Sequence, residues 1–292
     1  MKQKKMRFRK TTIIFTICSL FIACERDIDL NLPTEEVALV LEGGLTNENE
    51  VWQIKLSESA PYYSNSYPPI KDALVMITHG NEIDTLYQTD PGMYQTIDKK
   101  QGLVGESYTL TIKWKGNSYT ATEMLHDQLP LDTVAAFYLA MDNGFIEEGW
   151  YAFIGADEIQ GKRDRDYYEW KVFINDTLYE ENGILIDTDE FRDVGFWNIL
   201  IDPNNPLAQQ KEGILPRPIV SDFTEGDTVR IEQYAISKNY YDFLFGLQNL
   251  QNSGGPFSSP ASNPPSNIVS RKTAYGYFRV AHKVGGMVVI EE

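Results

Sequence analysis

The sequence of 292 residues is poor in cysteine and histidine, with two cysteines and three histidines. The histidines, His79, His126 and His282, are scattered and lack the spacing that places two imidazoles on one helical face. There is no Gly-x-Ser-x-Gly elbow and no glycine-rich phosphate loop, which disfavours serine hydrolases of the nucleophile-elbow type and nucleotide-binding enzymes. We therefore expect no enzyme activity, no cofactor and no metal site.

The chain carries 42 Asp and Glu residues, which could form a pair of catalytic carboxyl groups or a calcium site. A hydrolase that uses two carboxyl groups facing each other across a cleft has no fixed sequence spacing, so it stays open. The acids of Asp187–Asp193 alternate as in a calcium loop, but Phe191 takes a ligand place and Arg192 stands where an EF-hand needs glycine. We expect a solvated turn there.

No hydrophobic run is long enough to span a membrane. The longest, residues 11–23, has 13 residues, whereas a spanning helix needs about 18 or more. The basic run Lys2–Lys10 precedes it, and a small residue, Ala23, stands before Cys24. This pattern predicts a lipoprotein signal peptide over residues 1–23 with lipidation of Cys24; a plain cleaved signal with an incidental cysteine is the alternative.

Basic residues become scarcer still once residues 1–23 are removed. The remaining 269 residues hold 20 basic and 42 acidic residues, a net charge of −22. Such a surface repels nucleic acid.

With Cys18 removed and Cys24 lipidated, no thiol is left for a disulfide or a nucleophile. The acidic stretch 24–35 is either a solvated tether or an export signal that directs the lipoprotein to the cell surface.

The rest of the chain is rich in short runs of β-branched and aromatic residues bounded by turn residues. Val51–Ser57 alternates apolar and polar residues, and residues 115–117 form a hairpin signal between two such runs. We predict a mainly β fold, with a β-sandwich over residues 36–126, a boundary near Pro130 and a second β-rich domain over residues 131–292.

The second domain is expected to contain one amphipathic helix, over about residues 238–252. Ser237 can cap it, and Tyr240, Leu244 and Leu247 follow a spacing of three and four residues. We interpret this stripe as core-packing, because an exposed stripe of such residues favours aggregation. The sequence also predicts two final strands, Tyr275 to Ala281 and Gly286 to Ile290.

Aromatic rings and polar groups in two Pro- and Ser-rich segments, residues 60–69 and 256–267, are the candidates for ligand contact. Such stiff loops present rings for binding, or equally pack as caps on the fold. The candidate residues are Tyr62, Tyr63, Tyr67, Phe257 and Asn267.

Several short motifs follow one another in a characteristic order along the chain. They are Cys24 with its acidic tether, Val40-Leu41-Glu42-Gly43, Ala60-Pro61-Tyr62-Tyr63, Pro91-Gly92-Met93-Tyr94 and Tyr275-Gly276-Tyr277-Phe278. Their order resembles a family of Bacteroidota outer-membrane lipoproteins that share a domain of unknown function, DUF4249. The resemblance implies an outer-membrane location, a TonB-dependent transporter as partner and an N-terminal sandwich that is immunoglobulin-like or carboxypeptidase-regulatory-like. It supplies no catalytic residues.

These features together predict a lipid-anchored, surface-exposed accessory protein without enzyme activity. It would capture substrate, or serve as a lid, for a TonB-dependent transporter. The alternatives are a structural adhesin and a carboxylate-dependent hydrolase.

Overall fold

A computed structural model of the chain describes residues 36–60, 67–127, 133–139, 148–155, 167–179, 185–188, 219–220, 223–251 and 262–291. The chain divides into two compact units, Met1–Glu36 and Val37–Glu292. All described residues except Glu36 belong to the second unit. The predicted signal peptide, Cys24 and the acidic tether lie outside the described residues.

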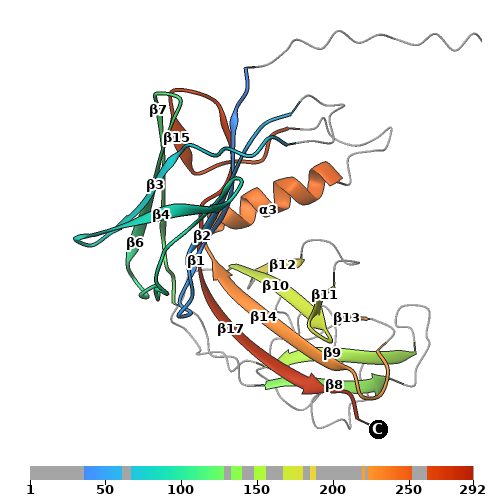
Figure 1. The fold of residues 1–292 in the computed structure, drawn as a ribbon. Helices are drawn as coiled ribbons and strands as arrows, with labels where there is room; N and C mark the ends of the chain where they lie inside the picture. Colours follow the sequence, from blue (N-terminus) through green and yellow to red (C-terminus); the bar gives the residue numbers. More distant parts are fainter. Residues whose placement is uncertain are drawn as a thin grey trace, which may run out of the picture. The chain divides into compact units, whose positions relative to one another are not determined.

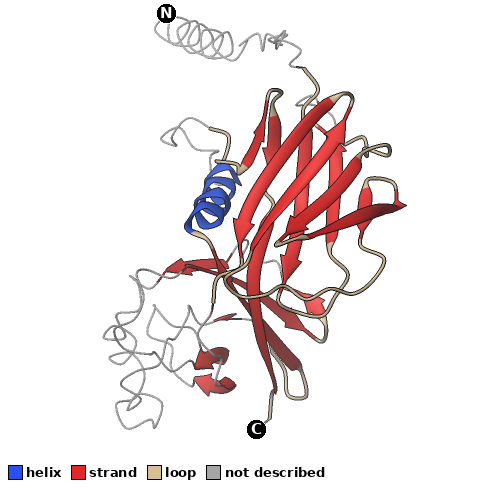
Figure 2. Cartoon of the chain, turned by 90° about the vertical axis from the view of Figure 1, so that its left-hand side faces the viewer, coloured by secondary structure: helices blue, strands red, loops and turns tan. Residues whose placement is uncertain are grey.

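The described part of the chain is mainly β with one helix, as the sequence predicts (Figure 2). The strands before the expected boundary are β1 (Leu39–Thr46), β2 (Gln53–Glu58), β3 (Leu74–His79), β4 (Glu82–Asp90), β5 (Met93–Gln95), β6 (Ser107–Trp114) and β7 (Asn117–Met124). Those after it are β8 (Thr133–Leu139), β9 (Gly149–Gly155), β10 (Tyr167–Ile174), β11 (Thr177–Leu178), β12 (Leu185–Thr188), β13 (Ile219–Val220), β14 (Thr228–Ile236), β15 (Ile268–Ser270), β16 (Ala274–Gly276) and β17 (Arg279–Val289). The helix is α3 (Lys238–Gln251).

Most strands belong to one 14-stranded sheet in the order β11-β10-β14-β17-β1-β2-β5-β4-β3-β6-β7-β15, with β12 beside β10 and β16 beside β1. Strands β13, β9 and β8 form a second sheet. Strand β1 pairs antiparallel with β2 and parallel with β16 and β17. It therefore joins the N-terminal strands to the C-terminal ones within one sheet, while the immunoglobulin-like sandwich and the boundary near Pro130 stay predictions.

The buried apolar residues fall into three groups. The largest contains side chains of strands β1 to β7, such as Trp52 and Tyr108, together with Phe278 and Val280. A second lies on one face of β10 and β14 and includes Tyr168 and Ile231. The third lies beneath α3 and includes Leu244, so the apolar stripe of the helix packs against the fold as predicted.

Two local predictions agree closely with the structure. The hairpin at residues 115–117 is a two-residue turn between β6 and β7, in which Lys115 and Gly116 have φ values of 46° and 74°. The helix begins after Ser237, whose Oγ accepts a hydrogen bond of 3.2 Å from the backbone N–H of Tyr240. Ser237 is therefore the N-cap.

The end of the chain differs from the prediction. The sequence predicts a break between two strands at residues 282–285, whereas β17 runs through them without interruption from Arg279 to Val289, paired with β14. The two strands lie side by side along their length (Figure 1). Continuous pairing with β14 satisfies the backbone hydrogen bonds that a turn would leave open.

Candidate ligand-binding pocket

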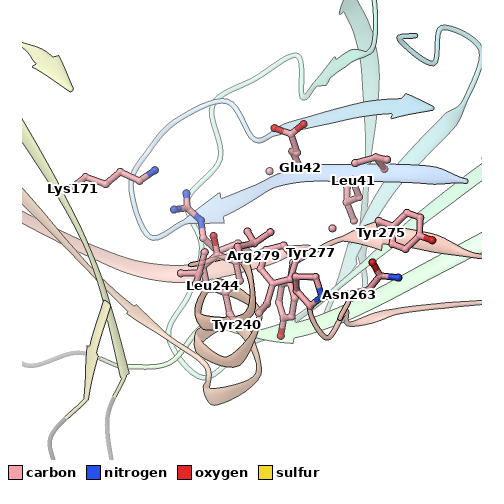
Figure 3. Close-up of a pocket in the computed structure, with 15 residues that line it drawn as sticks. Leu41, Glu42, Lys171, Tyr240, Leu244, Asn263, Tyr275, Tyr277 and Arg279 are labelled. Carbon is pink, nitrogen blue, oxygen red and sulfur yellow. The ribbon is translucent and has the colours of Figure 1, made fainter. Parts of the chain in front are cut away.

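A pocket of about 590 Å³ opens between helix α3 and the large sheet. Strands β1 and β16 and the start of β17 form one side, and Lys171 reaches it from β10 (Figure 3). The pocket is therefore assembled from both ends of the sequence. Its lining residues are Val40, Leu41, Glu42, Gly43, Lys171, Tyr240, Phe243, Leu244, Leu247, Asn263, Pro264, Tyr275, Gly276, Tyr277 and Arg279.

One wall of the pocket is apolar and comes from α3. Tyr240, Phe243, Leu244 and Leu247 share one helical face because they are spaced three and four residues apart. The ring of Phe243 lies 5.9 Å from that of Tyr240 and 5.4 Å from that of Tyr277. Tyr240 and Tyr277 are 5.0 Å apart. Aromatic pairs at these distances stabilise one another beyond their burial alone, so this wall is well fixed.

Hydrogen bonds link the start of α3 to β7 and to Tyr277, which lies between β16 and β17. The Ser237 hydroxyl donates to Glu123 Oε2 of β7 at 3.0 Å, and the Tyr277 hydroxyl donates to the same oxygen at 2.6 Å. Burial raises the pKa of Tyr277, and the neighbouring Glu123 raises it further. The Tyr277 hydroxyl therefore keeps its proton and remains a donor at neutral pH.

One end of the pocket is cationic. The Arg279 guanidinium lies 3.2 Å from Glu169 Oε2 and 4.7 Å from the centre of the Tyr234 ring. Lys171 Nζ lies 3.9 Å from Glu169 Oε1 and 5.3 Å from the same ring. Burial alone would lower the pKa of Arg279, but Glu169 and the surrounding groups raise it, so the guanidinium stays charged.

This end rests on alternate residues of β10, β14 and β17 that share one sheet face. Glu232 is buried, and it accepts hydrogen bonds from the Tyr234 hydroxyl at 2.6 Å and pairs with Lys283 at 2.9 Å and Arg230 at 2.5 Å. Burial alone would raise the pKa of Glu232, but these partners outweigh it and lower the pKa. The buried carboxylate is thus fully paired and remains ionised.

Lys171 differs from Arg279 because, among the described residues, its nearest carboxylate oxygen belongs to Glu169 and lies 3.9 Å away. Burial lowers the pKa of Lys171, and the attraction of Glu169 only partly offsets this. An incoming acceptor group would therefore stabilise the charged form of this amine. The pocket can hold a molecule with an apolar body along α3 and an acceptor-rich head group near Lys171 and Arg279.

Of the predicted contact residues, the structure describes Tyr67 and Asn267, and neither lines this pocket. Tyr67 is 65% exposed and precedes a bridge between Pro69 and Ser57. The Asn267 amide is bound to the backbone of Phe278, accepting from its N–H at 3.1 Å and donating to its carbonyl at 2.9 Å, so it supports the fold. The other candidates, Tyr62, Tyr63 and Phe257, lie outside the described residues.

The predicted acidic turn is only partly described. Asp187 lies in β12, opposite Tyr168 of β10. Residues 189–193 lie outside the described residues, so the expectation of a solvated turn there stays a prediction.

The sequence does not predict this pocket, and its two cationic residues, Lys171 and Arg279, are absent from the predicted contact residues. The stripe of α3 and the segment 256–267 were both singled out, and Asn263 and Pro264 of that segment do line the pocket. The pattern that could have revealed the cationic residues is the pair Glu169 and Lys171 in an otherwise apolar strand. Charged residues at alternate positions of a buried strand indicate paired charges on one face.

A family model described as a domain of unknown function, DUF4249, matches residues 25–284. No curated protein matches the chain. Among the described residues, α3 included, no helix is long and apolar enough to cross a membrane.

Proposed function

We propose that this chain, which belongs to the DUF4249 family, binds a small organic ligand in the pocket between α3 and the sheet. The observation that carries the proposal is the pairing of an aromatic wall with two cationic side chains in one cavity of about 590 Å³. Mostly apolar pockets with a few convergent polar groups are the usual form of small-molecule sites. The ligand would have an apolar body and a carboxylate or another acceptor-rich head.

The proposed location and partner of the chain come from its sequence. The signal at residues 1–23 and the lipid on Cys24 would anchor the protein to the outer membrane, with its folded part at the cell surface. There it would act, without enzyme activity, as a substrate-capturing accessory of a TonB-dependent transporter. A pocket that holds a ligand by packing and two donors suits capture and release, and the resemblance to Bacteroidota lipoproteins supports the partner.

Ligand binding is tested with anilinonaphthalene sulfonate, a fluorescent probe with an apolar ring system and an anionic head. Phe243→Ala removes a ring that lines the pocket, and we expect it to weaken probe binding about tenfold or more, because burying a Phe side chain is worth about 1.5–3 kcal/mol. Lys171→Met should also weaken binding. The matched control is Phe245→Ala on the same helix, which removes a 49% exposed ring outside the pocket.

If the Phe243→Ala and Phe245→Ala variants bind the probe with the same affinity, and both keep the circular dichroism of the wild type, the probe does not use this pocket. The partnership is tested separately, by extracting the lipidated chain from outer membranes in mild detergent and identifying the proteins bound to it. Cys24→Ala provides the unanchored control. Recovery of a large transporter only with the anchored chain supports the accessory role, and recovery of none removes it.

A further inference from the structure

A group of side chains that could bind a metal ion lies outside the pocket, at the hairpin between β3 and β4. His79 ends β3 and Glu82 begins β4, directly opposite each other across the turn at residues 80–81. Asp84 lies two residues further along β4. Opposite residues of an antiparallel pair share a face, as do residues two apart in a strand. The hairpin therefore places all three side chains on one face.

The distances between these side chains suit a single small ion. His79 Nε2 lies 2.9 Å from Asp84 Oδ2 and 3.9 Å from Glu82 Oε2. One ligand atom from each of the three residues lies within 4.8 Å of the others. A tetrahedral zinc ion with bonds of about 2.0–2.2 Å keeps its ligand atoms roughly 3.3 Å apart. The two distances from His79 differ from this spacing by less than about 1 Å, and the Glu82 side chain, which is 70% exposed, has room to adjust.

The neighbouring residues orient the ligands as they do around bound metals. Glu106 Oε1 lies 3.5 Å from His79 Nδ1, so it can accept the proton of the nitrogen that faces away from Asp84. Glu106 is itself bound through Oε2 by the Tyr108 hydroxyl at 3.1 Å. A carboxylate behind a ligating histidine is the usual supporting partner in zinc sites, because it fixes the tautomer and the ring orientation.

The other supports act on the imidazole ring and on the carboxylate. The His79 ring packs 5.2 Å from Tyr108 and 5.5 Å from Trp52, which hold it in place. Lys100 Nζ binds Asp84 Oδ1 at 2.8 Å. That contact leaves Oδ2, the oxygen nearest His79, for an ion.

We infer that His79, Glu82 and Asp84 form a binding site for one divalent transition-metal ion, with zinc as the first candidate. An imidazole nitrogen with two carboxylate oxygens is a donor set that zinc accepts, whereas calcium and magnesium prefer oxygen alone. Two carboxylates balance the charge of the ion. Three protein ligands leave a fourth position for water or for a group from outside the chain.

Equilibrium dialysis of the purified full-length chain against buffered zinc chloride tests the inference. We expect one zinc per wild-type chain, and binding at least about tenfold weaker for His79→Ala and for Glu82→Gln, since even outer-shell partners are worth 10–100-fold. The matched control is His126→Ala, which removes a histidine outside the group and should leave zinc affinity unchanged.

Glu106→Gln tests the positioning role, and should weaken zinc binding about 10–100-fold while leaving the unfolding midpoint in EDTA unchanged. If His79→Ala does not fold, Glu82→Gln decides the question, because its side chain is mostly exposed. Failure of the wild type to bind zinc, or wild-type affinity in Glu82→Gln, would leave these residues as an ion-pair cluster only and overturn the inference.

Discussion

Single charged residues carry unequal weight in this chain, according to how far water is excluded from them. The Glu169 carboxylate is buried and pairs with Arg279 and Lys171. The Glu42 carboxylate also pairs with a cation, Lys55, at 3.1 Å, but both side chains are more than half exposed. Among the 42 Asp and Glu residues of the chain, the buried Glu169 is therefore one that organises the cationic end of the pocket.

Glu169→Gln should therefore destabilise the chain clearly. Removing this charge leaves Arg279 without its partner, and breaking a mostly buried pair costs about 3 kcal/mol. We expect the free energy of unfolding, measured by urea denaturation, to fall by about 2–3 kcal/mol, since Arg279 keeps some contact with water. Glu42→Gln is the control, and should change it by less than about 0.5 kcal/mol. Equal losses in the two variants would contradict this.

At the level of elements, the pocket depends on the parallel pairing of β1 with β16 and β17. Gly276 lies opposite Leu41 and has a φ of 95°, and a Cβ added there would lie 1.9 Å from the Leu41 carbonyl oxygen. Only glycine fits such an approach. Because Gly276 also lines the pocket, this close pairing sets the distance between β1 and the aromatic wall.

Gly276→Ala should force β16 away from β1. The backbone conformation alone costs about 1 kcal/mol, and the clash adds to it, so we expect a loss of unfolding free energy of more than about 3 kcal/mol in urea denaturation. Gly116→Ala is the matched control. Its φ of 74° is also left-handed, but no atom lies within 4 Å of the added Cβ, so about 1 kcal/mol should be lost. A similar loss in both variants would show that the close approach is not essential.

The elements themselves were largely predictable from the sequence, whereas their partners were not. The hairpin at residues 115–117 and the helix with its cap at Ser237 follow from local turn and capping chemistry, and the structure confirms both. The local sequence predicts a break between strands at residues 282–285. Their pairing with β14, a tertiary contact, continues β17 through them.

The candidate sites were less predictable for the same reason. The pocket needs β1 to meet β16, and no local pattern specifies that pairing. His79, Glu82 and Asp84 match neither the helical spacing of paired ligands nor the pattern of a calcium loop. They lie in a hairpin, where opposite and alternate positions share a face, so only strand spacing relates them.

For the whole folded unit, buried tyrosines govern the response to alkaline pH. Tyr94, Tyr108, Tyr234 and Tyr277 are all buried. Burial raises the pKa of each, and that of Tyr108 reaches about 12. Free tyrosines ionise near pH 10, so above about that pH the unfolded chain releases protons that the folded chain still holds.

Stability should therefore be fully present below about pH 10 and should fall as pH rises from there. Each unit of difference in pKa removes up to about 1.4 kcal/mol per tyrosine, partly offset by Lys171, whose pKa burial lowers. Urea denaturation between pH 8 and about 11 measures the slope. Tyr108→Phe should reduce it, and ultraviolet absorbance should show fewer tyrosinates in the folded chain than in the unfolded chain at the same pH. A free energy of unfolding that stays constant over this range would mean that water reaches these hydroxyls in the folded state.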